Sequence, residues 1–196
     1  VTTRAKGRAG NALRRIGLTV PRASGTVFDL VPDGFDPYEI QEETAQLPTD
    51  AGGCVVLESA TGSGKTEAAI ARFAQLQAEG NVDSLYFAVP TRAAATQLYD
   101  RVEEAKKKLF DDPPSSVLAV PGYFKVDDIE GWKSYQKERY ETPARDLRAR
   151  GWAAERSKRY TSAPIAVGTV DQALQATLKN RHAHLRFAGL SRSLVV

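Results

Sequence analysis

A chain of 196 residues, 42% of them hydrophobic and 26% charged, has the composition of one globular domain with a sizeable core. Its single cysteine, Cys54, excludes a disulfide framework and suits a reducing cytoplasm, where we expect the protein to act. No apolar run approaches the length of a membrane span, so we expect no membrane association.

The formal net charge of +3 hides a segregated pattern. Residues 1–22 carry basic residues and no acid, the middle of the chain is acidic, and basic residues outnumber acids again from Lys133 to Arg159. A run of like charge is often only a solvated face, but two basic blocks on one domain favour a polyanionic partner. We interpret residues 1–30 as a basic linker or arm with one short helix.

Turn-forming residues over 31–37 lead into a predicted helix over 38–45 that begins behind Pro37. The apolar run Cys54–Leu57 then predicts a strand buried on both faces, as in a parallel sheet. After a glycine-containing loop, apolar residues recur at helical spacing until Gly80 and predict a second helix.

The loop between this strand and this helix has the chemistry of a phosphate-binding loop. Its glycines allow a tight turn that points backbone N–H groups at phosphate oxygens, and the helix N-terminus adds partial positive charge. Lys65 supplies a mobile full charge, and the Thr66 hydroxyl is a ligand for Mg²⁺. We therefore expect ATP and Mg²⁺ as cofactors, held by Thr61, Gly62, Ser63, Gly64, Lys65 and Thr66, with Lys65 and Thr66 as the catalytic pair. The alternative is a glycine-rich turn with an incidental lysine.

The loop departs from the general phosphate-loop pattern at Ser59, where that pattern has glycine. With this residue, Ser59–Thr66 resembles motif I of superfamily 2 helicases. In those helicases a Pro-aromatic-x-x-Gln stretch upstream of motif I grips adenine, and Pro37-Tyr38-Glu39-Ile40-Gln41 has that form. The resemblance implies that Tyr38 and Gln41 contact the base.

A strand over Leu85–Val89 is closed by Pro90-Thr91-Arg92-Ala93, which resembles motif Ia of the same helicases. A free helix N-terminus, a hydroxyl and a guanidinium are suited to hold the phosphates of a single strand, although Thr91 also suits a simple helix cap. The following helix has one apolar face, and we expect Lys106 to Lys108 on its solvated side.

A third strand is predicted over Ser116–Val120, followed by a basic and aromatic insertion at about 123–162. Interleaved rings and cations suit single-stranded nucleic acid, but aromatic residues also anchor surface helices to a core. Both interpretations of the insertion stay open at this stage.

Ile165–Val167 predicts a further strand, and Gly168 indicates a close backbone approach. We expect a helix from there to about Lys179-Asn180, with Thr169 and Gln172 forming a capping box. The functional interpretation places Gly168, Thr169, Val170 and Asp171 against a nucleic-acid backbone. Ser193–Val196 looks like the start of a core strand.

The most specific resemblance is carried by Gly168-Thr169-Val170-Asp171-Gln172-Ala173-Leu174, then by Lys179-Asn180-Arg181-His182-Ala183-His184-Leu185-Arg186 and Leu190. From about residue 35 onward the chain resembles the helicase-nuclease of type I CRISPR systems. The resemblance implies an α/β fold over residues 31–196: the first RecA-like domain of a two-domain motor, with a mostly parallel sheet flanked by helices. It also implies ATP-driven translocation on single-stranded DNA from 3′ toward 5′, and recruitment by the type I CRISPR surveillance complex.

Parts of the family pattern are missing from this sequence. The Asp-Glu motif that follows the last strand is absent, as are the arginines of the second RecA-like domain and the His-Asp (HD) dipeptide of the nuclease domain. The chain also contains no methionine and begins with Val1, which indicates a processed or excised piece, truncated before the motif II loop. We therefore expect this polypeptide alone to bind nucleotide weakly and to hydrolyse little or none.

Three alternative functions remain at the level of sequence. An RNA helicase is the main rival, because phosphate contacts do not distinguish the sugar. A small phosphate-loop phosphotransferase and a non-catalytic interaction module are the others.

Overall fold

The computed structural model describes residues 3–15, 20–48, 53–141, 150–179 and 181–196. Residues 142–149 of the predicted insertion and Asn180 of the predicted helix end lie outside the described residues. The chain forms a six-stranded sheet in the order β4-β3-β2-β5-β1-β6. Its strands are β1 (Ser84–Val89), β2 (Ser116–Ala119), β3 (Lys125–Val126), β4 (Ile129–Glu130), β5 (Ile165–Thr169) and β6 (Ser193–Val195).

Strands β2, β5, β1 and β6 are parallel, and β3 and β4 continue the sheet as an antiparallel hairpin. The helices before β5 are α1 (Thr3–Arg15), α2 (Val27–Leu30), α3 (Glu39–Gln46), α4 (Lys65–Ala78), α5 (Arg92–Leu109), α6 (Trp132–Glu141) and the 3₁₀ helix η1 (Ser157–Ser162). After β5 come α8 (Val170–Leu174) and α9 (Ala183–Leu190). No described helix is long and apolar enough to cross a membrane.

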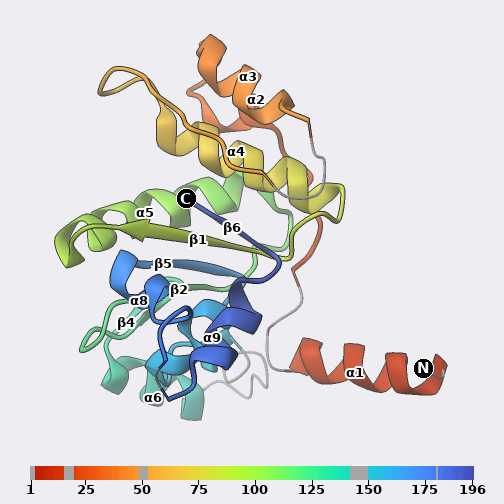
Figure 1. Cartoon of the computed structure of the whole chain (residues 1–196), viewed down its shortest axis with the longest axis vertical. Coiled ribbons are helices and arrows are strands. Elements are labelled where there is room, and N and C mark those ends of the chain that lie inside the picture. Colours follow the sequence, from red (N-terminus) through yellow and green to blue (C-terminus); the bar gives the residue numbers. More distant parts are fainter. Residues whose placement is uncertain (1–2, 16–19, 49–52, 142–149, 180) are drawn as a thin grey trace.

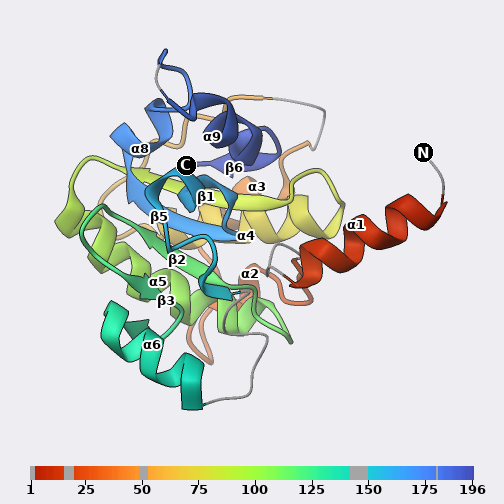
Figure 2. The same ribbon diagram turned by 90° about the horizontal axis from the view of Figure 1, so that it is seen from below.

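The sheet separates two hydrophobic clusters because successive strand residues face opposite sides. Leu85 and Phe87 of β1 pack against the layer of α4 and α5, which α2 and α3 cover in turn (Figure 1). Tyr86, between them, packs on the other side with Val117, Ala166 and Tyr160. Seen from below, α8 and α9 lie on that second side, while α1 projects from the body (Figure 2).

The packed body begins before the predicted arm ends. Val20 and Ala23 contact the first hydrophobic cluster, and Val27 and Leu30 of α2 belong to it. The backbone N–H of Ala23 donates to Gln77 Oε1 of α4 at 2.8 Å. The arm boundary at residue 30 stays a prediction, but residues 20–30 lie on α4 and α5.

Most predicted elements are confirmed by the structure: a helix behind Pro37, helices after Gly64 and Thr91, and strands near 85–89, 116–120, 165–167 and 193–196. The predicted strand Cys54–Leu57 is wrong. Val55 and Val56 are 60% and 86% exposed, and Cys54 is an exposed free thiol. An apolar run predicts burial, but it does not show that a neighbouring strand is there to pair with. Among the described residues the sheet ends at β6, and no strand from residues 54–57 pairs with its outer edge.

Two predictions around β5 also need correction. The helix after Gly168 ends at Leu174 rather than near residue 179. Leu174 and Leu178 are 51% and 56% exposed, so the apolar side chains of a longer helix would gain little burial to stabilise it. The capping box does not form. Thr169 is the last residue of β5, and the Gln172 side chain is buried instead of reaching back to its backbone.

The prediction of a solvated Lys106 is wrong as well, although Lys107 and Lys108 are exposed as predicted. Lys106 is 2% exposed and its Nζ lies 2.7 Å from both Glu103 Oε1 and Asp127 Oδ1. Arg150 Nε lies 2.7 Å from the second oxygen of Asp127. Burial alone raises the pKa of Asp127, but Arg150 and Lys106 outweigh it and hold that pKa below its ordinary value. The cluster joins α5 to the hairpin that follows β2.

We expect Lys106→Met to destabilise the chain by about 3–5 kcal/mol, because it leaves Glu103 and Asp127 buried without their ammonium partner. Lys107→Met is the matched control, since Lys107 is exposed and pairs with an exposed Asp128. Urea unfolding of both variants measures the difference. Equal unfolding midpoints for the two variants would contradict this role of Lys106.

Candidate functional site

The loop before α4 is held in a conformation that favours glycine. Gly62 and Gly64 have φ values of 84° and 76°, in the left-handed region, and Gly64 is the N-cap of α4. Gly64 O accepts the first helical hydrogen bond, from Ala68 N at 2.9 Å. Thr61 and Gly62 are exposed, so the loop stays open to solvent. The N-terminus of a 14-residue helix therefore faces outward behind a glycine turn.

Lys65 folds back over this loop. Its Nζ donates to the carbonyl oxygens of Ser59 at 2.8 Å and Ala60 at 2.7 Å. The hydroxyls of Ser59 and Ser63 are hydrogen-bonded across the same turn. The ammonium group thus lies within the loop and rests on neutral acceptors, with no carboxylate among its hydrogen-bond partners in the described part of the chain.

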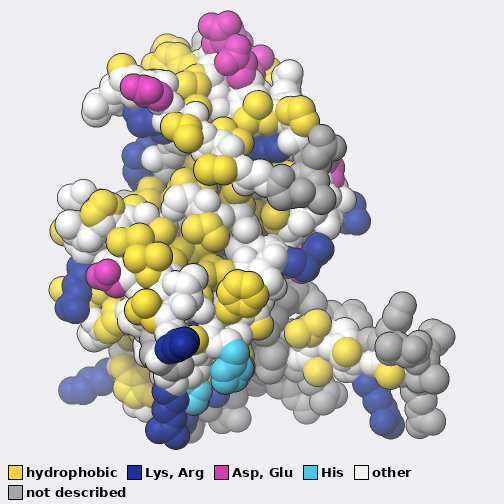
Figure 3. Space-filling view, viewed as in Figure 1, with side chains coloured by type: hydrophobic (Ala, Val, Ile, Leu, Met, Phe, Trp, Pro, Cys, Tyr) yellow, Lys and Arg dark blue, Asp and Glu magenta, His cyan; other side chains and the backbone are white. Residues whose placement is uncertain are grey.

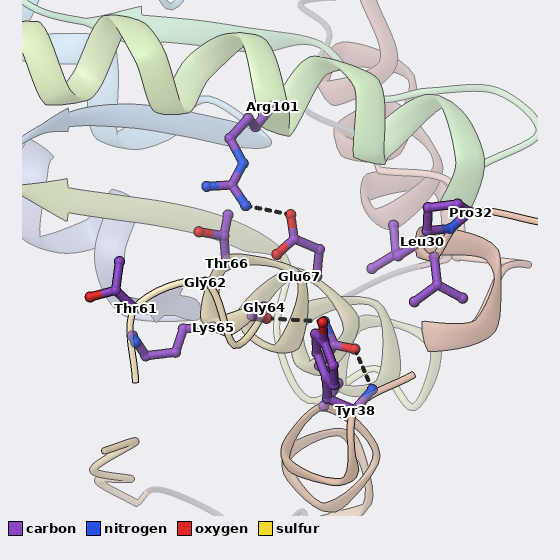
Figure 4. A pocket seen from close by; sticks show the side chains of 12 residues that line it. Leu30, Pro32, Tyr38, Thr61, Gly62, Gly64, Lys65, Thr66, Glu67 and Arg101 are labelled. Atoms are coloured by element: carbon purple, nitrogen blue, oxygen red, sulfur yellow. Dashed lines mark hydrogen bonds and ion pairs between the residues drawn. The ribbon is translucent and has the colours of Figure 1, made fainter. Parts of the chain in front are cut away.

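A cavity of about 540 Å³ lies against the loop (Figure 4). Its walls come from the turn after α2, the start of α3, the loop with the first turn of α4, and one residue of α5. The lining residues are Leu30, Val31, Pro32, Tyr38, Gln41, Thr61, Gly62, Gly64, Lys65, Thr66, Glu67 and Arg101. Of the predicted nucleotide residues, all but Ser63 line this cavity.

Gln41 joins α3 to the loop. It is 2% exposed, its Oε1 accepts from Tyr38 N at 2.9 Å, and its Nε2 donates to Gly64 O at 3.2 Å. Tyr38, by contrast, is 60% exposed at the mouth of the cavity. Both ends of the Gln41 amide have partners within the chain, and its contact with adenine stays a prediction.

Arg72 fixes α3 from its other end. Its guanidinium donates to the carbonyl oxygens of Ala45 and the C-cap Leu47, which a helix C-terminus leaves without helical partners, and to that of Pro48 just beyond the helix. Burial lowers the pKa of Arg72, with Glu79 opposing that shift. The α3 wall of the cavity therefore has contacts near both ends of α3, with Gly64 at the start of α4 and with Arg72 of α4.

Sequence reasoning missed the ion pair that closes the cavity opposite Tyr38. Arg101 Nη2 lies 2.6 Å from Glu67 Oε1, linking α5 to the first turn of α4 (Figure 4). It also missed Leu30, Val31 and Pro32, which were interpreted only as turn material or as part of the arm. The position of Glu67 directly after the loop is the sequence signal that could have placed it at the cavity. No pattern in the residues around Arg101 indicates that it lies beside Glu67.

The Thr66 hydroxyl fits one ligand position of Mg²⁺, which in proteins keeps several waters and takes its other ligands from phosphates. Thr66 lines the cavity at the first turn of α4. No group of three or more His, Cys, Asp and Glu residues suited to a metal occurs within the described ranges. His182 and His184 belong to a basic region. Desolvation lowers the pKa of His182, and the nearby charges of Lys158, Arg181 and Arg186 lower it further.

The predicted nucleic-acid residues lie in adjacent turns. Parallel pairing places Val89 beside Thr169, so Pro90–Ala93 after β1 and Gly168–Asp171 around the end of β5 share the carboxyl edge of the sheet. Thr91 caps α5, since its Oγ1 accepts from Ala94 N at 3.1 Å, and Arg92 is exposed. Thr169 is largely buried, whereas Val170 and Asp171 are exposed.

Tyr86 supports the second of these turns from inside. Its hydroxyl donates to Thr169 O at 3.3 Å, and burial raises its pKa, which keeps the phenol protonated. A Cβ at Gly168 would lie 2.6 Å from Tyr86 Oη and 2.7 Å from Ala119, so the predicted close approach at Gly168 is confirmed.

Charge is unevenly distributed over the molecule. In the space-filling view, Asp and Glu side chains gather over α3, and the histidines lie at the opposite end beside Lys and Arg side chains (Figure 3). Further Lys and Arg side chains are scattered between the two ends. This agrees with the charge pattern of the sequence.

Comparison with known proteins decides the family. The DEAD/DEAH box helicase family matches residues 38–190. The chain belongs to this helicase family. Family membership confirms the RecA-like fold and leaves the phosphotransferase alternative without support.

The relatives of this helicase domain agree with the resemblance found in the sequence. The CRISPR-associated endonuclease/helicase Cas3 of Escherichia coli K12 is 30% identical over 171 residues, 87% of this chain and 19% of its own. The CRISPR-associated nuclease/helicase Cas3 of Streptococcus thermophilus is 32% identical over 172 residues, 83% of this chain and 18% of its own. The crystal structure of T. fusca Cas3-AMPPNP gives a TM-score of 0.67 at 30% identity, covering 96% of this chain and 20% of that one. This helicase domain thus spans about a fifth of the length of its relatives.

We expect Gly64→Ala to destabilise the domain more than Gly62→Ala. Both positions have positive φ, which costs a side chain about 1–2 kcal/mol. Only at Gly64 would the added Cβ also collide with the Gln41 amide, whereas nothing lies within 4 Å of a Cβ at Gly62. Thermal unfolding of the two variants measures the difference; an equal loss in both would show that Gln41 does not pack on the loop.

Proposed function

We propose that residues 31–196 form the first RecA-like domain of a two-domain, ATP-dependent translocase on single-stranded DNA that acts in type I CRISPR interference, unwinding target DNA for degradation. The observation that carries the proposal is the left-handed glycine loop at the start of α4, opening onto a cavity in a chain of helicase ancestry. T. fusca Cas3 relatives were solved with AMPPNP, ADP and ATP, which supports a nucleotide as the ligand of this cavity.

In this proposal the nucleotide phosphates lie on the backbone N–H groups of Gly62–Thr66 at the positive end of α4. Lys65 moves from the carbonyls of Ser59 and Ala60 to the phosphates, because an anion is a stronger partner for an ammonium group than a neutral carbonyl. Thr66 would hold Mg²⁺, which neutralises phosphate charge when bound.

The base is assigned to the side of the cavity that α3 forms. The exposed ring of Tyr38 offers a face for stacking, and Gln41 lies behind it against the loop. For Gln41 to pair with adenine, its amide has to exchange at least one of its bonds to Tyr38 N and Gly64 O for the base. Nucleotide binding would thereby be coupled to the loop through Gln41.

Single-stranded DNA is assigned to the carboxyl edge of the sheet. Thr91, Arg92 and the α5 N-terminus offer donors to phosphates, and the turn Gly168–Asp171 lies beside them. Contacts of this kind position a strand without reading its sequence, as a translocase requires. The relatives' names include endonuclease and CRISPR-associated functions, so we assign the surveillance complex, a second RecA-like domain and an HD nuclease domain as partners of the longer protein.

Lys65→Ala should weaken binding of a fluorescent ATP analogue at least tenfold, because the charged contact to the phosphates is lost. Lys108→Ala, an exposed lysine at the far end of α5, is the control and should bind as the wild type does. Similar affinity in Lys65→Ala and wild type would refute the assignment of the loop as a nucleotide site.

ATP turnover by residues 1–196 should be little or none, whereas a longer polypeptide that continues beyond Val196 should hydrolyse ATP. The physical reason is that the Asp-Glu motif would hold Mg²⁺ and position the attacking water, and the arginines of the second domain would stabilise charge on the transferred phosphoryl group. Steady-state ATPase assays compare the two polypeptides, with DNA and RNA as alternative stimulants. Equal turnover would contradict the proposal, and stronger stimulation by RNA would favour the RNA helicase alternative.

A further inference from the structure

A rigid turn follows β2 at the same edge of the sheet as the proposed DNA contacts. Val120–Tyr123 has Pro121 and Gly122 at its centre, Gly122 has a φ of 88°, and Tyr123 N donates to Val120 O at 3.1 Å. These features define a type II β-turn, in which proline fixes the first central residue and glycine accepts the positive φ of the second. The backbone position of Tyr123 is therefore set by the turn itself.

The register of the sheet places this turn next to the β5 turn. Ala119 of β2 pairs with Gly168 of β5, and Val89 of β1 pairs with Thr169. Because the three strands are parallel and adjacent, Pro121–Tyr123, Gly168–Asp171 and Pro90–Ala93 follow one another along a single edge, about 5 Å per strand. They lie at the same side of the fold as the start of α5 and α8 (Figure 1).

Tyr123 differs from the neighbouring rings in how it packs. Phe124, Trp132 and Tyr135 form a cluster with ring centroids 4.9–5.5 Å apart, and Tyr135 is fully buried at its base. Those rings anchor α6 to the hairpin, so for them the anchoring interpretation is confirmed. Tyr123 is 54% exposed and takes part in no ring pair with another described side chain.

We propose that Tyr123 is a base-stacking residue for the single strand that crosses the carboxyl edge of the sheet, extending its path from the β1 and β5 turns to the β2 turn. This inference rests on the proposed DNA path. Because the turn fixes the backbone that carries Tyr123, only the two side-chain torsions of the ring lose freedom when a base stacks on it. Stacking tolerates every base because each has a π-face. Phosphate contacts at Thr91 and Arg92 together with a ring at Tyr123 give the pairing of cations and aromatics that single-strand binding uses.

The test compares two fluorescein-labelled oligonucleotides of equal length and charge, dT20 and a strand of abasic sites, by anisotropy with the 196-residue chain. Wild type should bind dT20 more tightly than the abasic strand. Tyr123→Ala should weaken dT20 binding roughly tenfold and leave the abasic strand unchanged, while Tyr123→Phe should restore dT20 binding because the ring is retained.

Two further variants separate stacking from the phosphate path. Phe28→Ala removes a ring of similar exposure (56%) on α2 and should change neither affinity. Arg92→Ala should weaken both oligonucleotides alike, since it removes a phosphate contact. If Tyr123→Ala binds dT20 as wild type does, or loses both strands equally, stacking at Tyr123 is refuted while the DNA path stands. If wild type binds neither strand, the DNA path is refuted and stacking falls with it.

Discussion

Parallel pairing of β2, β5 and β1 is the constraint on which the proposed functions of this domain depend. In a parallel sheet every strand reaches the same edge with its carboxyl end, so the segments that follow the strands are brought together however far apart they lie in the chain. Here residues near 90, 121 and 169 become neighbours through the pairs Val89–Thr169 and Ala119–Gly168. Gly168 makes this possible locally, because a side chain at that position would collide with Tyr86 and Ala119.

The glycine loop before α4, residues 61–64, depends on tertiary support of another kind. No described strand holds the segment before it, and Val55 and Val56 are exposed. The loop is held instead from the α3 side, where Gln41 bonds to Gly64 O and Arg72 binds the carbonyls at the end of α3. Gln41 therefore both lines the cavity and contacts the loop at Gly64, where α4 starts.

A buried ionic cluster links the two functional regions through α5. Lys106 bonds to Glu103 of its own helix and to Asp127 of the hairpin, while Ser116 of β2 and Arg150 complete the cluster. Burial raises the pKa of Glu103, and the ammonium of Lys106 opposes that rise. Since α5 also carries Arg101 of the cavity and is capped by Thr91, the helix connects the cavity wall, the β1 turn and the hairpin that follows the Val120–Tyr123 turn. A displacement of α5 would reach all three.

The sequence by itself determined the features that are written in a few consecutive residues. Gly62, Gly64 and Lys65 predicted the loop and the start of α4, Thr91 predicted a helix cap, and Gly168 predicted a close approach; each depends on backbone freedom or a local hydrogen bond. Only the tertiary structure decided what lies across from each residue. Cys54–Leu57 has the apolarity of a buried strand but no partner edge, and Lys106 has the spacing of a surface residue but meets Asp127 from a hairpin 21 positions away. Glu67 and Arg101 meet because two helices pack side by side. A turn, a cap or a left-handed glycine depends on a few consecutive residues, so the sequence of that segment can predict it. Burial and pairing depend on two segments that meet in the fold, and the pattern within one segment does not identify the segment that it meets.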